Sequence, residues 1–238
     1  MQFLLRDSHF HQFKMLSQIE NDWAGRNPQQ WAAKIGVDHS TVCDLPDGKV
    51  DRELLKSMCA DKANSSECCL LTIMAWGGMK CSHGRMIWRY RDKLKPIVDH
   101  LRRGNMTRQV AYETLRNFRL NAPGSGMGPA YYTKLIYFAA PMHDGYIMDQ
   151  WTASAVNILF DNGNRPVVWT SRSEFRGRRT DTVSDRNTGD TYEIFCRSIE
   201  YLSDRIYEAS AEDVEKRLFS RGGRFPGAWR QYVKAHRQ

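Results

Sequence analysis

A glycine turn between two stretches of helical periodicity constrains the fold of this chain more than any other feature. The turn is Gly126-Met127-Gly128, and Pro129 follows it. Proline suits the first position of a helix, where its missing N–H costs nothing, and glycines permit positive φ and the close approach of another backbone. The first N–H groups of the following helix would point outward beside the positive end of its dipole, which can hold a phosphate without reading sequence. A plain helix–helix turn fits the same residues, so the turn alone leaves both interpretations open.

Most of the chain shows helical periodicity, and strand signals are poor. Pro96 interrupts the longest pattern and can kink it. Asn105 or Thr107 is the expected start of the next helix, and a capping-box-like sequence at Ser210 marks a later one. The expected helices cover 86–103, 107–118, 129–140, 147–160, 191–208 and 210–219.

The composition indicates a soluble protein with a polyanionic partner. Its 238 residues are enough for one generous domain or two small ones that share a core. The net charge is +8 and the pI is about 9.2, and a positive surface gains affinity by releasing counterions from nucleic-acid phosphates. No apolar run approaches the roughly 20 residues of a membrane span, and the start of the chain is not typical of a secretory signal. We therefore expect a cytoplasmic protein without a membrane partner.

Two regions do not fit the helical pattern. The run Pro166–Trp169 is apolar but too short to decide between strand and helix. The stretch from Thr170 to Asp190 is polar and charged, and we expect a loop there, either solvated and mobile or turned toward DNA. The arginines that favour the second interpretation are Arg172, Arg176, Arg178, Arg179 and Arg186.

The chain has six cysteines, and none of them forms a C-x-x-C pair. Cys59, Cys68, Cys69 and Cys81 lie close enough in sequence for an iron–sulfur cluster to be considered. Adjacent cysteines rarely ligate one iron site together, however, and the spacing matches no established ligand pattern. We expect buried thiols in a reducing compartment, with no metal and no other cofactor.

Two residues after the turn carry chemically useful groups. Lys134 follows Gly128 among apolar neighbours, where a lysine either extends its amine to solvent or keeps it, partly desolvated, as a nucleophile. Asp149 comes 149 − 134 = 15 residues later, at the expected start of the next helix, as a helix cap alone or as a catalytic carboxylate. Cleavage of an N-glycosidic bond would use both groups. The carboxylate stabilises positive charge on the sugar, and the amine can attack C1′.

The segment from Leu120 to Leu159 resembles the helix-hairpin-helix and catalytic-aspartate region of DNA glycosylases. It most resembles the 8-oxoguanine glycosylase-like branch, which includes the archaeal type. The run Lys134-Leu-Ile-Tyr137 is similar to that of the archaeal type, whereas the commoner members have their lysine at the position of Ala130. Asp149 lies where the family's aspartate lies, counted from the hairpin. Phe138 lies where the family packs a side chain against the extruded base.

The resemblance implies a mainly α, helix-hairpin-helix DNA glycosylase-like fold with two helical subdomains that flank a catalytic cleft. One subdomain would combine 1–104 with 190–238, and the other would be 105–189, with the hairpin at 121–140 and the helix of the catalytic aspartate. The implied protein is a monomeric DNA glycosylase without an obligate protein partner. It would flip a damaged or modified base out of double-stranded DNA and excise it, leaving an abasic site.

The resemblance also assigns roles to residues. Asp149 and Lys134 would be catalytic, and a Schiff base at Lys134 would add lyase activity. Gly126, Met127 and Gly128 would bind DNA. A glycosylase holds the extruded base between aromatic faces, and the candidates for this pocket are Phe138, Trp76, Trp88 and Trp151. Trp151 departs from the small or histidine residue expected two positions after the aspartate.

The sequence leaves the substrate and one rival function open. The base is either an oxidised purine, which is the family default, or a modified base of foreign (phage) DNA, such as a modified cytosine. The first substrate implies DNA repair and the second implies defence. A non-catalytic helix-hairpin-helix module that only binds DNA is the alternative function. A nuclease or an RNA-binding protein has only the basic charge in its favour, since no carboxylate cluster suited to two metal ions is evident.

Overall fold

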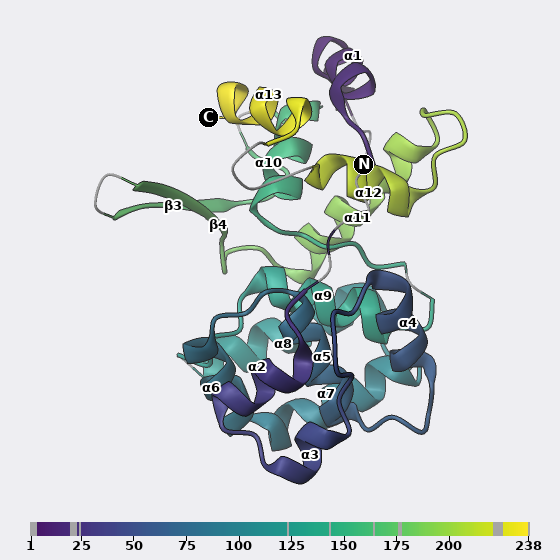
Figure 1. The fold of residues 1–238 in the computed structure, drawn as a ribbon. Helices are drawn as coiled ribbons and strands as arrows, with labels where there is room; N and C mark the ends of the chain where they lie inside the picture. Colours follow the sequence, from purple (N-terminus) through teal and green to yellow (C-terminus); the bar gives the residue numbers. More distant parts are fainter. Residues whose placement is uncertain are drawn as a thin grey trace. The chain divides into compact units, whose positions relative to one another are not determined.

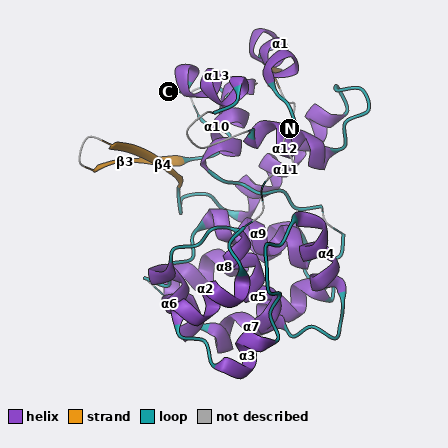
Figure 2. Ribbon diagram, in the orientation of Figure 1, coloured by secondary structure: helices purple, strands orange, loops and turns teal. Residues whose placement is uncertain are grey.

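The computed structural model describes residues 4–19, 23, 25–122, 124–142, 144–163, 165–175, 178–220 and 226–237, without the side chains of 173–175 and 178–180. The fold is mainly helical, as the sequence predicts (Figure 2). The chain forms two compact units (Figure 1): the hairpin unit, Asp22–Gly145, and the split unit, Met1–Asn21 with Tyr146–Gln238. These bounds differ from the expected subdomains, because the two helices around the glycine turn pack with the helices that precede them.

The hairpin unit is built around α5 (Ser66–Trp76), a helix that is apolar on all sides. Nearly all of its residues are buried, and Ser65 caps its start by accepting a hydrogen bond from the Cys68 amide. Four helices pack around it, namely α2 (Pro28–Ile35), α4 (Arg52–Ala60), α7 (Arg91–Arg102) and α9 (Pro129–Ala139). The other helices described in this unit are α3 (His39–Cys43), α6 (Cys81–Arg89) and α8 (Arg108–Asn121).

The single helix expected over 86–103 is two helices, α6 and α7, which meet at Tyr90. Tyr90 has φ −101° and ψ 10°, and its N–H donates to the Ile87 carbonyl in a tight turn. The apolar face continues across the break, since Ile87 and Leu94 are both buried. The prediction of one helix was wrong because this continuous apolar spacing hides the break. Pro96 lies inside α7 without ending it.

The helix–turn–helix around the glycine turn is present as expected. The Thr107 side chain accepts a hydrogen bond from the Val110 amide and caps α8, which confirms the predicted start. α8 packs against α9, and Tyr112 of α8 meets Tyr132 of α9 edge to face, with ring centres 5.6 Å apart. The turn between the two helices is therefore held by a buried interface.

The split unit is organised around α10 (Gln150–Leu159), on which its other helices pack. β1 (Leu4–Leu5) pairs antiparallel with β2 (Phe160–Asp161), which joins the N-terminal segment to the end of α10. Ser210 and Asp213 form the expected capping box. The helices around α10 are α1 (Asp7–Leu16), α11 (Gly189–Ser203), α12 (Ala211–Phe219) and α13 (Ala228–His236).

A β-hairpin stands where the sequence predicts a loop over 170–190. β3 (Thr170–Phe175) pairs antiparallel with β4 (Arg178–Val183), and the hairpin extends away from the helices of its unit (Figure 1). The sequence does not indicate these strands, because polar residues dominate both and no alternation of apolar residues marks them. Arg176, one of the arginines expected in the loop, lies outside the described residues.

The run Pro166–Trp169, which the sequence left undecided, is neither strand nor helix. The Asn157 side chain exchanges two hydrogen bonds of 2.8 Å with the backbone of Val168. Asn187 exchanges two hydrogen bonds of 2.8 Å with Trp169 in the same way. These two side-chain amides satisfy backbone groups that would otherwise need a strand partner.

Candidate active site

The two glycines of the hairpin turn are required for different reasons. Gly126 has φ +76°, and a Cβ placed on it would lie 2.8 Å from the Cα of His83, so only glycine fits. Gly128 has φ −121° and ψ 178°, which any residue adopts, and a Cβ there would meet no atom within 4 Å. The expected need for positive φ therefore holds at Gly126 and not at Gly128. Met127 is fully buried, so it anchors the turn and leaves only backbone atoms to face a ligand.

Helix α9 starts without a side-chain cap from any described residue. Its N-cap is Gly128, which has no side chain, and Pro129 has no N–H. The Tyr131 and Tyr132 amides donate to the Gly128 carbonyl at 2.8 and 3.2 Å. The Ala130 N–H has no carbonyl of its own helix to bond, and it lies at the positive end of the helix dipole. Open space at Gly128 and this dipole end together form the geometry of an anion site.

Lys134 is buried on α9, with 9% of its surface exposed. Its Nζ donates a 2.9 Å hydrogen bond to the Ala130 carbonyl and lies 5.4 Å from the centre of the Tyr131 ring. The aliphatic part of the side chain packs on Gly77, where an added Cβ would lie 2.9 Å from Lys134 Cδ. Burial raises the pKa of the Tyr131 phenol, so the ring beside the amine stays neutral. The sequence allowed the Lys134 amine either to extend to solvent or to stay partly desolvated. In the structure the amine folds back along α9 and does not extend to solvent.

Trp76 and Phe138, two of the predicted pocket aromatics, are in contact beside this lysine. Phe138 lies one turn after Lys134 on α9, and Trp76 ends α5 directly before Gly77. Their ring centres are 4.7 Å apart at an interplanar angle of 74°. Phe138 is 0% exposed and Trp76 is 3% exposed, so neighbouring atoms of the protein already cover both rings. Their role as walls of a base pocket remains a prediction.

Helix α4 brings positive charge to the same aromatic cluster. The guanidinium of Arg52 lies 5.1 Å from the ring centre of Tyr137 and 5.6 Å from that of Trp76. The Lys56 amine lies 5.0 Å from the Tyr137 ring centre. A group of cations on one surface raises the local concentration of a polyanion.

Asp149 is the N-cap of α10 and part of a complete capping box. Its Oδ1 accepts hydrogen bonds from the Trp151 and Thr152 amides at 2.8 and 3.0 Å, and its own N–H donates to Thr152 Oγ1 at 2.9 Å. Oδ2 makes no hydrogen bond within the described part of the chain. One oxygen therefore fixes the carboxylate, and the other is available. The two interpretations of Asp149, helix cap and catalytic carboxylate, are compatible in this geometry.

Trp151, in the first turn of α10, is half-buried among cations of the C-terminal segment. The charged groups of Arg230, Arg237 and Lys234 lie 4.4, 5.3 and 5.5 Å from its ring centre. Arg237 also forms an ion pair of 2.7 Å with Asp181 of β4, so the C-terminal segment is tied to the base of the β-hairpin. Trp151, which replaces the small or histidine residue expected at this position, thus lies in a cluster of cations within the split unit. A role for Trp151 in the base pocket stays a prediction.

Trp88, the remaining predicted pocket aromatic, is half-buried on α6. The Arg91 guanidinium lies 4.8 Å from its ring centre. The hairpin unit therefore groups Lys134 with Trp76 and Phe138, and it holds Trp88 on a different helix. Asp149 and Trp151 belong to the split unit.

Trp23 is a residue beside this group that the sequence did not single out. It is 50% exposed, and its indole N–H donates to the Trp76 carbonyl at 3.1 Å. Its ring meets Trp76 edge to face at 6.4 Å, and an atom of the ring would lie 3.8 Å from a Cβ on Gly78. The only available signal was an isolated tryptophan in a polar segment, and that signal is too weak to place it beside Lys134.

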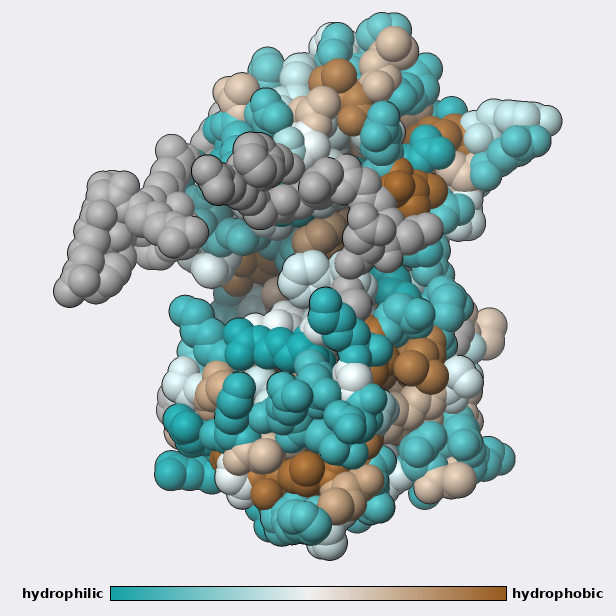
Figure 3. Space-filling model, in the orientation of Figure 1, coloured by the Kyte–Doolittle hydropathy of each residue, from teal (hydrophilic) through white to brown (hydrophobic). Residues whose placement is uncertain are grey.

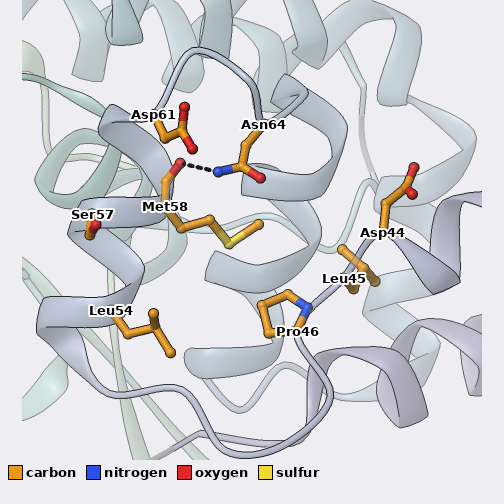
Figure 4. Close-up of a pocket in the computed structure, with 8 residues that line it drawn as sticks. All are labelled: Asp44, Leu45, Pro46, Leu54, Ser57, Met58, Asp61 and Asn64. Atoms are coloured by element: carbon orange, nitrogen blue, oxygen red, sulfur yellow. Dashed lines mark hydrogen bonds between the residues drawn. The ribbon is translucent and has the colours of Figure 1, made fainter.

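A shallow cavity of about 380 Å³ lies elsewhere in the hairpin unit (Figure 4). Its wall includes Asp44 and Pro46, which precede α4, together with Leu54 of α4 and Asn64 beyond it, and none of the predicted site residues lines it.

Hydrophilic side chains cover much of the hairpin-unit surface in Figure 3, in keeping with the high charge. Within the described ranges, no group of three or more His, Cys, Asp or Glu side chains could hold a metal ion. No described helix is long and apolar enough to span a membrane.

Comparison with known proteins extends the resemblance far beyond the hairpin segment. The family model described as "Putative 8-oxoguanine DNA glycosylase OGG-like protein" matches residues 17–219. The match therefore includes the glycine turn, Lys134, Asp149 and most of both units. No curated protein and no solved structure matches the chain.

Proposed function

Because the chain belongs to the family of OGG-like 8-oxoguanine DNA glycosylases, we propose that it is a DNA N-glycosylase that excises a damaged or modified base from double-stranded DNA. The enzyme extrudes the target nucleotide and breaks the bond between the base and C1′, which leaves an abasic site. An oxidised purine is the first candidate substrate. A modified base of foreign DNA, such as a modified cytosine, is the second, and the enzyme would then act in defence.

The geometry of Asp149 is the observation that carries this proposal. As the C1′–N bond breaks, its electron pair leaves with the base and positive charge develops on the sugar. A carboxylate fixed through Oδ1, with Oδ2 available, is suited to stabilise that charge without reorganising. When water then bonds to C1′, the same oxygen accepts the proton that the water loses.

Lys134 supplies the second chemical group of the proposal. Its amine attacks C1′ in place of water, the base departs with the bonding electrons, and loss of a proton with opening of the sugar ring gives a Schiff base. That intermediate permits strand cleavage by elimination. The packing of the side chain against Gly77 and its 9% exposure support this role, because they hold the amine in one place on α9.

The hairpin turn is the proposed grip on the DNA backbone. The open space at Gly128 and the uncapped start of α9 suit one phosphate, which would be held without sequence readout. Arg52 and Lys56 lie beside Tyr137, near the other end of α9, and they add positive charge to the same unit without contacting the turn.

The test of the function is an excision assay on a panel of duplexes with single modified bases, among them 8-oxoguanine and 5-hydroxymethylcytosine. We expect the wild type to release at least one base and Asp149→Asn to release it at least about 100-fold more slowly. Asparagine is the matched substitution, because it caps a helix as well as aspartate does and removes only the charge. Unchanged excision by the variant would overturn the mechanism. Tight binding with no abasic product on any duplex would favour the non-catalytic DNA-binding module.

Borohydride trapping tests Lys134 separately. We expect the wild type to yield a covalent DNA adduct, and Lys134→Met, which keeps most of the side-chain volume, to yield none. Gly77→Ala retains the lysine but should also reduce trapping. The new Cβ would lie 2.9 Å from Cδ and 3.2 Å from Cε of Lys134 and would displace the side chain. An adduct that persists in Lys134→Met removes the assigned role.

A further inference from the structure

Trp23 presents the exposed end of an aromatic row beside Lys134. The row runs from Phe138, at 0% exposure, through Trp76, at 3%, to Trp23, at 50%. Each ring meets the next edge to face, with ring centres 4.7 and 6.4 Å apart. Because the two inner rings are covered, a base cannot lie flat on either of them unless they move. Trp23 is the member of the row with accessible surface.

Trp23, Gly25 and Arg26 lie against the end of α5. The Trp23 indole N–H donates to the Trp76 carbonyl at 3.1 Å, and the Arg26 amide donates to the Ala75 carbonyl at 3.2 Å. Between them, Gly25 approaches so closely that a Cβ on it would lie 2.2 Å from Trp76 Cα. The exposed ring is therefore held in position, as a stacking surface must be.

Trp23 and Lys134 flank the same short turn. The side chain of Lys134 packs on Gly77, and Trp23 approaches Gly78, the next residue. A nucleotide whose C1′ reaches the Lys134 amine must place its base within about one ring width of that lysine. Trp23 offers an exposed aromatic face at the adjoining residue of this turn.

We propose that Trp23 is a base-binding residue whose exposed indole face stacks on the extruded base. This inference rests on the proposed glycosylase function, since it presumes that a base leaves the duplex. Stacking favours flat, polarisable bases and tolerates different edges. The indole N–H is already bonded to the Trp76 carbonyl, so Trp23 contributes its face and no hydrogen bond to the base.

The test compares the binding of duplexes that differ only in the presence of the target base. The probes are a duplex with 8-oxoguanine, a duplex with 5-hydroxymethylcytosine and a duplex with a tetrahydrofuran abasic analogue at the same position. All variants carry Asp149→Asn to suppress turnover. We expect Trp23→Ala to weaken binding of at least one base-containing duplex by about 5- to 100-fold and to leave the tetrahydrofuran duplex unchanged. Trp23→Phe should lose less, because it keeps an aromatic face.

Tyr207→Ala is the matched control, because Tyr207 is an aromatic residue at 89% exposure outside this row, and it should alter none of the affinities. An equal loss on all three duplexes, or no loss on any, overturns the stacking role. Thermal unfolding of each variant checks that the fold persists. If the wild type excises nothing and Trp23→Ala still shows the base-dependent loss, the proposed reaction fails while the base-stacking site stands.

Discussion

Two successive helices, α9 and α10, begin in opposite ways. α9 starts at Gly128, which offers no side chain, and a Cβ there would meet no atom within 4 Å. α10 starts at Asp149, whose Oδ1 accepts two backbone amides of its first turn. The first helix leaves its positive end open, and the second fills that end with a carboxylate of its own.

The difference separates binding from chemistry. A helix start without a side-chain cap leaves an amide, here that of Ala130, without a partner in its own helix, and a DNA phosphate can accept a hydrogen bond from it. A helix start capped by aspartate has no such need. It fixes the carboxylate instead, because Oδ1 accepts hydrogen bonds from two backbone amides and, at 3.4 Å, from the Thr152 hydroxyl. Under the proposed function, we expect a change at the turn to alter DNA affinity and a change at Asp149 to alter the rate of the reaction.

The largest effect on this comparison is expected from alanine at the two glycines of the turn. Gly126→Ala should destabilise the fold by about 1–3 kcal/mol, because φ is +76° and the Cβ would meet the His83 backbone. Gly128→Ala should cost roughly 0.5 kcal/mol, the difference between glycine and alanine at an N-cap, yet lower DNA affinity about tenfold by blocking the phosphate. Chemical denaturation and equilibrium binding to an abasic-analogue duplex measure the two effects.

Gly227→Ala is the control for this pair. Gly227 is also the N-cap of a helix, α13, with no side-chain cap among the described residues and a φ of −59°. Its substitution should cost a similar small amount of stability and leave the affinity unchanged. If Gly128→Ala binds DNA as tightly as the wild type does, the turn is a plain helix–helix connection. The proposed phosphate site at the start of α9 would then be wrong.

The sequence predicted the helical fold because apolar periodicity and helix caps are local signals. Thr107 and Ser210 begin their helices as expected, since a hydroxyl placed before an apolar run satisfies the first amides. Two features that apolar spacing does not mark were not predicted. The strands β3 and β4 stabilise one another through backbone pairing between polar residues, and the break at Tyr90 preserves the apolar face on both sides.

The candidate site was predictable only in part, for the same reason. Spacing from the hairpin singled out Lys134, Phe138 and Asp149, and aromatic character alone suggested the tryptophans of the pocket. The packing of Lys134 on Gly77 and the attachment of Trp23 to the Trp76 carbonyl join residues more than 50 positions apart. No local pattern reports such contacts. Gly126 and Gly128 are equivalent in sequence, and the positive φ of Gly126 and its approach to the His83 backbone distinguish them in the structure.

The last and smallest effect concerns the cap at Asp149. It tests the part of the comparison that concerns the start of α10. Asp149→Ala removes both hydrogen bonds that Oδ1 accepts at the start of α10, so the free energy of unfolding should fall by about 1 kcal/mol relative to Asp149→Asn, which retains an acceptor. Both variants lack the charge and should be equally slow in excision. Urea denaturation measures the stability difference, and single-turnover excision measures the rate. Equal stability of the two variants would mean that the cap contributes nothing, and the carboxylate would then need another means of orientation. A faster rate in Asp149→Asn than in Asp149→Ala would show that hydrogen bonding by this side chain, and not its charge alone, assists the departure of the base.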